Sequence, residues 1–528
     1  MKSRPGLQLT AVTLTAVLAA CGGSEDSAPE SASVPLTVPK VASCANGDSP
    51  ETALQGQVPA ALRASGFAGF NCNLKLVGQF QGEGGNWSSA MFTDGAGRSC
   101  AYHSTAAPVA GRQFPGVPVI DITDRSHPQR VTSLTTAAML EPWESLRVND
   151  RRQILIADNG QNGGGGAEVD IYDLSGDCSN PQLLASMKVG TGTDGGIQPA
   201  KAPIGHEGSI TADGLTYYIG DLVNKAYHAV DITNTTRPKL IASYSIESLG
   251  LKAGTTAHGL SVSNDGNRGY AVLLGIPNGD FFDPPAIADP NNLANGFVIF
   301  DTSEVRARKP GAQIKLISKV LYRDGSIAQH TIPVTIAGKQ YLVVVDEGGS
   351  AGLTDGPAAN VACQANLAPF PMARIYDIND EANPKPVSKL MLETHDPKNC
   401  AQVIPDIVGL NTFTYGSHYC SVDNRDNATA MACAYFNSGI RIFDIRDPAR
   451  PKEIAYYNPA PAAAVPGSSH VTRNQWRAGG PDWCASRMDF DFAKKQLVTM
   501  CQDNGLLILE FAPNTWPFRE STPSLNQS

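Results

Sequence analysis

Residues 439–454, GIRIFDIRDPARPKEI, contain the pattern that decides the fold. The β-branched and aromatic residues at its start form a short apolar run that is typical of a strand. Asp444 then begins a polar turn, because its carboxylate can accept hydrogen bonds from nearby backbone amides. Pro451 closes the turn, and a second apolar run follows. The stretch therefore predicts two strands joined by a tight turn.

The same pattern recurs along the chain. Residues 227–241 (YHAVDITNTTRPKLI) and 372–387 (MARIYDINDEANPKPV) are clear copies, whereas 505–517 (GLLILEFAPNTWP) is degenerate. The acidic residues of the copies are Asp121, Asp173, Asp231, Asp301, Asp377, Asp444 and Glu510. Repeats that each build one small sheet are typical of radial folds. The sequence therefore predicts an all-β protein, a seven-bladed β-propeller.

The repeat pattern, a hydrophobic residue followed by Ile/Val-Asp-Ile/Leu, a polar turn and Pro, resembles the LVIVD repeat of bacterial extracytoplasmic β-propellers. The resemblance covers about residues 70 to 513. It implies a propeller fold and a periplasmic or surface location, and it implies no particular reaction. We assign residues 66–515 to the propeller and 516–528 to a C-terminal tail.

The N-terminal side of the propeller suggests how the ring closes. Residues 74–80 (LKLVGQF) look like the fourth strands of other repeats, such as 238–244 (PKLIASY). The last repeat has no fourth strand of its own after Pro513. We expect the N-terminal strand to complete the C-terminal blade, which would remove an exposed sheet edge.

One position near the start of each first strand also aligns between repeats. These residues are Trp87, Trp143, His206, His258, His330, His418 and Trp483, each seven residues before a turn. Equivalent positions should surround one mouth of the central channel, which we call the ring face. Two long insertions, 276–295 and 348–371, also fall on this face. Because loops on a rigid scaffold usually carry function, the ring face is the expected binding surface.

Four successive blades place histidines at this ring: His206, His258, His330 and His418. Imidazole is a common ligand of Fe, Cu and Zn, so one hypothesis is a transition-metal site at the channel. Glu144 and Glu207 are expected to orient the imidazoles from behind. The alternative is structural, since a histidine at this repeated position can cap its blade by bonding the neighbouring backbone. The sequence leaves both open.

The first twenty residues resemble a lipoprotein signal peptide. Lys2 and Arg4 precede an apolar stretch, residues 9–20, that is short for a membrane span. Residues 18–21 (LAAC) resemble a bacterial lipobox, which implies that Cys21 is lipidated and becomes the N-terminus. Gly22 resembles the sorting signal of outer-membrane lipoproteins. Residues 21–65 are expected to form a disordered, flexible linker to the membrane.

Ten further cysteines, an even number, predict disulfides in an oxidising compartment. Cys420 and Cys433 flank the turn of one predicted hairpin, and Cys484 and Cys501 flank another. Cys363 and Cys400 should lie in loops on one face. The sequence predicts no pairing for Cys44, Cys72, Cys100 and Cys178.

Composition excludes some functions. The formal net charge is −9, without the basic surface that a nucleic-acid partner requires. The sequence contains neither a GxSxG nucleophile motif nor a phosphate-binding GxxxxGK[ST] loop. We expect a lipid-anchored cell-envelope protein that binds a protein or small molecule, or acts as a scaffold, through its ring face. The alternative is a metal-dependent oxidoreductase with the four histidines as ligands, and whether the protein is an enzyme stays open.

Overall fold

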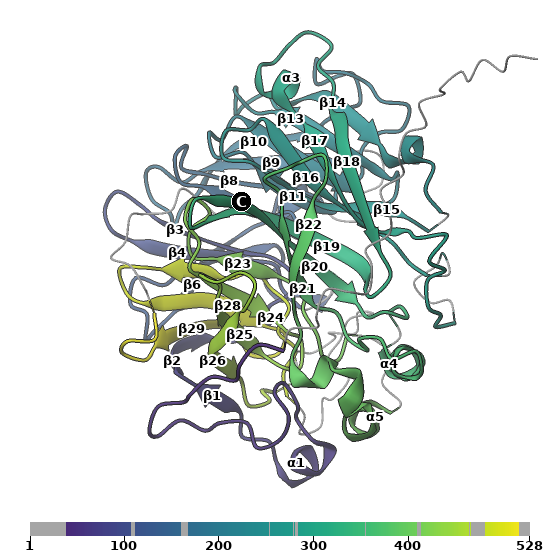
Figure 1. The fold of residues 1–528 in the computed structure, drawn as a ribbon. Helices are drawn as coiled ribbons and strands as arrows, with labels where there is room; N and C mark the ends of the chain where they lie inside the picture. Colours follow the sequence, from purple (N-terminus) through teal and green to yellow (C-terminus); the bar gives the residue numbers. More distant parts are fainter. Residues whose placement is uncertain are drawn as a thin grey trace, which may run out of the picture.

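The computed structural model describes residues 38–106, 111–159, 167–252, 254–277, 279, 284–353, 355–408, 413–463, 465 and 481–516. These residues form seven antiparallel sheets (Figure 1). The innermost strands of blades one to five contact one another in order, hydrogen bonds link blades five, six and seven, and the last blade contacts the first. The predicted all-β, seven-bladed propeller is confirmed.

Each blade uses four consecutive strands, apart from the sixth and seventh, which also recruit strands from the N-terminus. Blades one to three consist of β3 (Ser89–Thr93), β4 (Ser99–His103), β5 (Val117–Asp121), β6 (Gln129–Leu134); β7 (Arg147–Asn149), β8 (Ile154–Asp158), β9 (Glu168–Asp173), β10 (Gln182–Lys188); and β11 (Glu207–Ile210), β12 (Thr216–Asp221), β13 (Ala226–Asp231), β14 (Lys239–Ser245). Blades four and five consist of β15 (Thr256–Val262), β16 (Arg268–Leu274), β17 (Asn295–Asp301), β18 (Lys315–Tyr322); and β19 (Ser326–Ile336), β20 (Lys339–Gly348), β21 (Ala373–Asp377), β22 (Lys385–Leu390). Blades six and seven consist of β23 (Cys420–Val422), β24 (Ala430–Ala434), β25 (Ile440–Asp444), β26 (Lys452–Asn458) with β1 (Phe70–Cys72); and β27 (Asp489–Asp491), β28 (Gln496–Cys501), β29 (Gly505–Phe511) with β2 (Leu74–Phe80).

Short helices connect these strands. They are α1 (Ala60–Ser65), α2 (Ala137–Leu140), η2 (Ile246–Leu249), α3 (Ser303–Arg306), α4 (Asp355–Gln364), η3 (Glu393–His395), η4 (Pro397–Asn399) and α5 (Cys400–Ile407). None of the helices in the described part of the chain has the length and apolar character needed to cross a bilayer.

The repeated pattern explains the blade structure. Third strands such as β25 are buried on both faces, which their continuous apolar sequence requires. Outer strands such as β6 and β10 are mostly exposed or half-buried, with one buried residue each. Aspartates at the ends of third strands begin the turns as predicted: the backbone N–H of Thr233 donates to Asp231 Oδ1 over 3.0 Å, and that of Asn379 donates to Asp377 Oδ1 over 2.9 Å.

The predicted closure of the ring is confirmed. Strand β2 pairs antiparallel with β29, from Leu74 opposite Phe511 to Phe80 opposite Leu506. The first described strands therefore supply the outer edge of the last blade. Trp516, which the sequence analysis assigned to the tail, packs against Phe490 and Phe511 of the same blade.

The N-terminal segment is more ordered than expected. Residues 38–65 were predicted to belong to the flexible linker, but they pack along blade six. Val58 is fully buried, and Glu51 forms an ion pair with the buried guanidinium of Arg441. These partners lie far away in the sequence, so composition alone could not indicate them. Cys21 and the predicted signal peptide lie outside the described residues.

The described residues contain five disulfides. Cys420–Cys433, Cys484–Cys501 and Cys363–Cys400 are the pairs that the sequence analysis favoured. The other two are Cys44–Cys72, which ties the N-terminal segment to β1, and Cys100–Cys178, which joins blades one and two.

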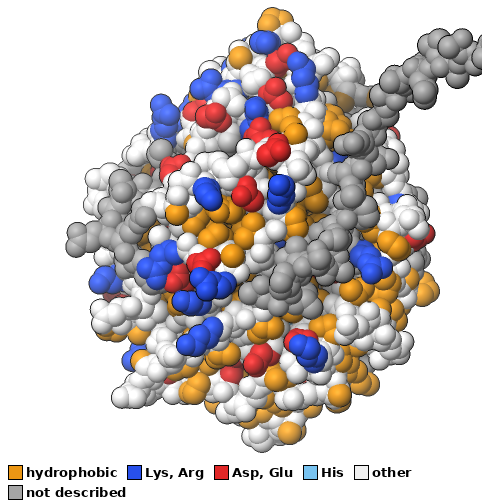
Figure 2. All heavy atoms as spheres, viewed as in Figure 1, with side chains coloured by type: hydrophobic (Ala, Val, Ile, Leu, Met, Phe, Trp, Pro, Cys, Tyr) orange, Lys and Arg blue, Asp and Glu red, His pale blue; other side chains and the backbone are white. Residues whose placement is uncertain are grey.

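The long links on the ring face form an additional layer, which we call the cap: α4, α5 and residues 51–58. Cys363–Cys400 joins the two helices, and Phe370 and Tyr415 pack between them. The N–H of Val58 donates to Tyr415 Oη over 3.1 Å. Figure 1 shows α1, α4 and α5 at the same end of the molecule. On the face drawn in Figure 2, acidic and basic side chains are interspersed.

Candidate metal centre in the central channel

Three adjacent blades direct acidic and imidazole side chains into the channel. Glu144 precedes β7 in blade two, His206 precedes β11 in blade three, and His258 lies on β15 in blade four. The backbone brings the first two together, because the N–H of Glu144 donates to the carbonyl of His206 over 3.2 Å. All three side chains are buried, with relative exposures of 2%, 6% and 2%.

The three potential ligand atoms converge. His206 Nε2 lies 2.9 Å from His258 Nε2, and Glu144 Oε2 lies 3.4 Å and 3.2 Å from them. Ligand atoms bound tetrahedrally at about 2.0 Å from one zinc ion would be about 3.3 Å apart. The observed separations therefore fit one metal ion with small side-chain adjustments.

The polar atoms around this point are incompletely satisfied within the described part of the chain. Glu144 Oε2, His206 Nδ1 and His418 Nε2 are buried and make no hydrogen bond of good geometry. Buried polar groups without such partners are uncommon and call for an explanation, an ion among them. Glu144 Oε2 in particular faces two imidazole nitrogens, which is the arrangement expected for groups that share a cation.

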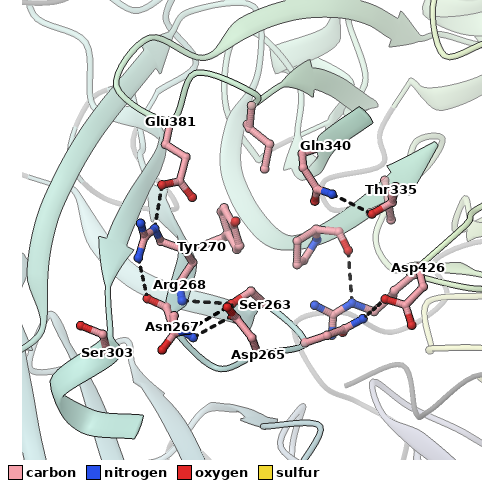
Figure 3. A pocket seen from close by; sticks show the side chains of 15 residues that line it. Ser263, Asp265, Asn267, Arg268, Tyr270, Ser303, Thr335, Gln340, Glu381 and Asp426 are labelled. Atoms are coloured by element: carbon pink, nitrogen blue, oxygen red, sulfur yellow. Dashed lines mark hydrogen bonds and ion pairs between the residues drawn. The ribbon is translucent and has the colours of Figure 1, made fainter. Parts of the chain in front are cut away.

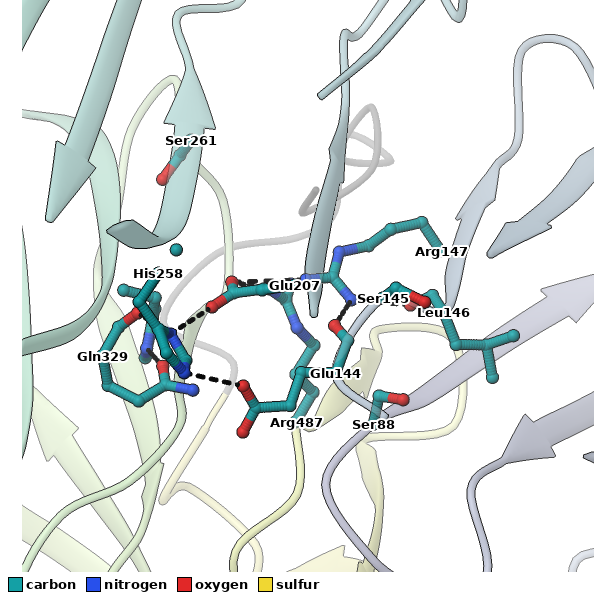
Figure 4. A network of polar contacts seen from close by, with 12 residues as sticks. Ser88, Glu144, Ser145, Leu146, Arg147, Glu207, His258, Ser261, Gln329 and Arg487 are labelled. Atoms are coloured by element: carbon teal, nitrogen blue, oxygen red, sulfur yellow. Dashed lines mark hydrogen bonds and ion pairs between the residues drawn. The ribbon is translucent and has the colours of Figure 1, made fainter. Parts of the chain in front are cut away.

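Glu207 contacts the Nδ1 nitrogen of His258, on the side of the ring away from Glu144 and His206. Its Oε2 lies 3.1 Å from His258 Nδ1, and the carbonyl oxygen of Gln329 lies 2.9 Å from the same nitrogen (Figure 4). A proton on Nδ1 leaves the lone pair of Nε2 directed at the candidate centre. Gly259 permits this contact, because a Cβ there would lie 2.5 Å from Glu207 Oε2.

The channel holds Glu207 between two arginines. Arg147 and Arg487 place guanidinium nitrogens 3.5 Å and 3.3 Å from its Oε1. Figure 4 shows both arginines beside Glu207, and it shows Glu144 at the other ring nitrogen of His258. A charged carboxylate is thus stabilised deep in the channel.

Glu144 lies among the candidate ligands, although the sequence analysis expected it behind them. His418 takes the supporting position instead. Its Nε2 lies 3.3 Å from Glu144 Oε1 and 3.1 Å from Glu347 Oε2, and its Nδ1 lies 2.5 Å from the carbonyl of Ala485. His418 therefore fixes the far oxygen of Glu144 while the near oxygen faces His206 and His258.

His330 does not join the other three histidines. Its Nε2 accepts a hydrogen bond from the N–H of Cys420 over 3.3 Å, and its ring stacks on Tyr419. The reason is the hairpin of blade five, in which Ile336 pairs with Lys339, whereas Ile210 pairs with Tyr217 in blade three. Because the turn of blade five is shorter, the residue seven positions before it is not equivalent to His206. His330 therefore lies at another level of the channel.

The same contacts determine the pKa values of the buried imidazoles and of Glu144. Burial opposes a charge on His258, but the carboxylates of Glu144 and Glu207 outweigh it and raise its pKa to about 9. Burial likewise opposes a charge on His418, and the carboxylates of Glu144 and Glu347 raise its pKa to about 10. Burial alone would raise the pKa of Glu144, but the imidazoles hold it well below its ordinary value. A cation that binds here must displace a proton.

Among the described residues, apolar side chains fill the ring-face mouth of the channel. We call this cluster the aromatic plug; it consists of Trp87, Trp143, Trp483, Phe413 and Phe436. The ring centroids of Trp87 and Trp483 are 5.1 Å apart, and those of Trp87 and His418 are 4.9 Å apart. The predicted convergence of Trp87, Trp143 and Trp483 on one mouth is thus observed, but these side chains close the channel.

Sequence reasoning missed Glu347, Arg147 and Arg487. Glu347 is the penultimate residue of β20, a second strand, whereas the alignment compared only the starts of first strands. The acidic pair Asp346-Glu347 after a continuous apolar strand was the available signal. Arg147 and Arg487 each lie four residues after a ring position, Trp143 and Trp483, so the same repeat alignment could have found them.

Comparisons with known proteins show no family for this chain. No protein-family profile and no curated protein matches the chain. Among solved structures, the periplasmic gluconolactonase of Pseudomonas aeruginosa is 11% identical, with a TM-score of 0.47, over 76% of this chain and 90% of that chain. The hydrazine synthase of Kuenenia stuttgartiensis is 13% identical, with a TM-score of 0.46, over 83% of this chain and 97% of that chain. A putative 6-phosphogluconolactonase of Bacteroides uniformis is 11% identical, with a TM-score of 0.45, over 76% and 89%.

Proposed function

We propose that this protein is a metal-binding β-propeller of the bacterial cell envelope, in which Glu144, His206 and His258 hold one divalent transition-metal ion. The observation that carries the proposal is the convergence of two imidazole nitrogens and one carboxylate oxygen within 3.4 Å of one another. Two histidines and one carboxylate are the donors of non-haem Fe(II) centres and of several catalytic zinc sites. Three protein ligands leave a coordination position for water or substrate, unlike closed structural sites.

The identity of the metal decides which chemistry follows. Iron or copper would support a metal-dependent oxidoreductase, whereas zinc would act as a Lewis acid. The protein contributes the same features in each case: a buried donor set, a fixed tautomer at His258 and a carboxylate held by His418. The aromatic plug keeps bulk water away from the ring-face side.

Cobalt substitution tests the proposal. Metal-free protein without a histidine tag is titrated with Co(II), and the visible absorption of the ion is followed. We expect saturation at one Co(II) per chain, with the intense bands of a four- or five-coordinate site. Only the weak spectrum of aqueous Co(II), at any ratio, would contradict the proposal.

The envelope location rests on the disulfides and on the N-terminal sequence. Five disulfides among the described residues fit an oxidising compartment. We propose that Cys21 carries the lipid and that the protein is anchored to the outer membrane. In a bacterial host, mass spectrometry of the mature N-terminal peptide should find acyl chains on Cys21; an N-terminal peptide without acyl chains would argue against lipidation.

A second candidate function is binding or scaffolding through the ring face. The observation in its favour is the cap, an ordered layer that closure of the propeller does not require. Val408 at the end of α5 is 74% exposed on this layer. A photo-crosslinking residue at position 408 should give a defined adduct in envelope preparations, whereas one at Leu183, on an outer strand, should not. Equal labelling at both positions would count against the cap as a binding surface.

A further inference from the structure

The two mouths of the channel are closed in different ways. On the ring face, the aromatic plug packs several large rings together, with Phe436 and Trp483 stacked at 4.8 Å. Buried aromatic side chains of this kind each cover about 150–250 Å² of surface. Opening this mouth would require several of them to move at once.

At the opposite mouth, one side chain links three blades. Arg425 lies in the turn between β23 and β24 of blade six and reaches across the channel. Its Nε donates to the carbonyl of Pro333 in blade five over 3.2 Å, and a terminal nitrogen donates to the carbonyl of Val262 in blade four. The backbone carbonyl of Arg425 also accepts from the N–H of Thr335 over 2.7 Å. Arg425 therefore joins three blades at the far end of the channel.

A small cavity lies directly inside Arg425. Its volume is about 20 Å³, enough for one water molecule. Its polar lining includes Glu207, Ser261, His330, Arg425 and Arg487. Glu207 is the carboxylate that contacts His258 Nδ1, so the cavity reaches the back of the candidate metal centre.

A wide cleft lies on the outer side of the same arginine. Its volume is about 710 Å³, and it lies between the turns of blades four, five and six. Figure 3 shows its walls, with Ser263, Asp265 and Arg268 on one side and Thr335 and Gln340 on the other. Arg425 lines both this cleft and the small cavity, so it separates the two.

We propose that this far-face cleft is the entrance to the channel, that Arg425 is its gate, and that the solute admitted is the hydrated divalent metal ion of the Glu144–His206–His258 centre. The inference rests on the proposed function and adds the route by which the metal ion reaches its site. Opening requires the Arg425 side chain to leave its partners, the carbonyls of Pro333 and Val262 among them, for water in the cleft.

Charge around the gate fits retention of a cation. Asp265 and Asp426 lie on the rim of the cleft, where they would attract a divalent ion from solution. Burial lowers the pKa of Arg425 to about 10, so its guanidinium stays charged at neutral pH. The closed gate therefore places a positive charge across the exit and slows the loss of the metal.

Chelator-driven metal loss tests the gate. Co(II)-loaded wild-type protein, Arg425→Ala and Arg425→Gln are mixed with excess chelator, and the rate of metal loss is measured. We expect both variants to lose metal at least about tenfold faster, the factor that corresponds to about 1.4 kcal/mol. Trp483→Leu, which removes one ring of the aromatic plug and leaves the other four in place, should lose metal at the wild-type rate. Unchanged rates in the Arg425 variants, or equal acceleration in Trp483→Leu, would overturn the proposal.

A second measurement needs no metal. Deuterium exchange at the imidazole Cε1 of His330, which lines the small cavity, is followed by mass spectrometry in the metal-free proteins. Exchange should accelerate in either folded Arg425 variant, whereas His395, buried against Phe370 and Tyr435, should be unaffected. Faster exchange at His330 in a protein that binds no metal would support the proposed gate and contradict the proposed metal centre. Metal binding with unchanged exchange and unchanged loss rates would reject the gate alone.

Discussion

His206 Nε2 and His258 Nε2 lie 2.9 Å apart although the residues are 52 positions apart in the sequence. Adjacent blades bring them together, and neither side chain is accessible to bulk solvent. Two imidazole nitrogens this close must share a proton or a cation. Because His258 Nδ1 contacts Glu207 and the carbonyl of Gln329, the lone pair of its Nε2 is directed at the shared position.

Glu207→Gln tests whether this orientation matters for metal affinity. The amide is similar in size to the carboxylate, but it lacks the negative charge that holds the proton on His258 Nδ1. We expect metal affinity to fall by about 10- to 100-fold, the usual effect of removing a group behind a metal ligand. Competition with a chelator of known affinity measures the change. An affinity equal to that of the wild type would show that Glu207 only neutralises Arg147 and Arg487.

Asp158→Asn tests the buried contact between blades two and three. Asp158 Oδ2 lies 2.9 Å from Tyr217 Oη, which donates to the carbonyl of Ser145 over 2.7 Å. Burial raises the pKa of Asp158 to about 8, so the folded protein keeps a proton that the unfolded chain has already lost. This contribution to the free energy of unfolding is complete below about pH 4 and is lost as the pH rises through about 8.

The asparagine variant removes this titration and can still donate to Tyr217 Oη. In urea unfolding we expect it to be more stable than the wild type at about pH 9, with a smaller difference at about pH 6. Asp221→Asn is the control. Burial opposes the charge on Asp221, but His228 and the Asn224 amides outweigh it and lower its pKa, so this variant should be destabilised at both pH values. If Asp158→Asn loses stability equally at both pH values, Asp158 is charged in the folded protein.

Arg441→Met tests how the N-terminal segment is held. Arg441 is fully buried between Glu453 at 2.8 Å and Glu51 of the N-terminal segment. Removing the cation leaves two buried carboxylates, and we expect the free energy of unfolding to fall by about 3–5 kcal/mol. Arg446→Met, which removes an exposed partner of Asp444 in the same blade, should change it by less than about 1 kcal/mol. Similar effects in the two variants would mean that the segment contributes little to stability.

The repeats made most of the fold predictable. An apolar strand, an acidic turn residue and a proline recur in every clear copy, so blade number and closure by residues 74–80 follow from local chemistry. Cys420 and Cys433 could be paired because they face each other across one hairpin. Cys44 and Cys72 could not, since no repeat includes the N-terminal segment.

The candidate site was predictable only in part. Equal spacing brought His206 and His258 to one level of the channel, but the two-residue hairpin at Ala337 and Gly338 placed His330 elsewhere. The role of Glu144 depends on its direct approach to the two imidazoles, a distance between blades that no spacing along the chain encodes. The far-face closure by Arg425 is likewise a contact between separate blades.

Metal content in a set of single variants tests the central claim most directly. Untagged wild-type protein, Glu144→Gln, His206→Ala, His258→Ala and His330→Ala are loaded with the metal found in the wild type, desalted and measured by elemental mass spectrometry, with His228→Ala as a control for loss of a buried histidine. His228 is paired with Asp221 away from the candidate centre. We predict one metal ion per chain in the wild type, His330→Ala and His228→Ala, and almost none in the other three. Equal metal content in all six proteins, or no metal in the wild type, would contradict the account.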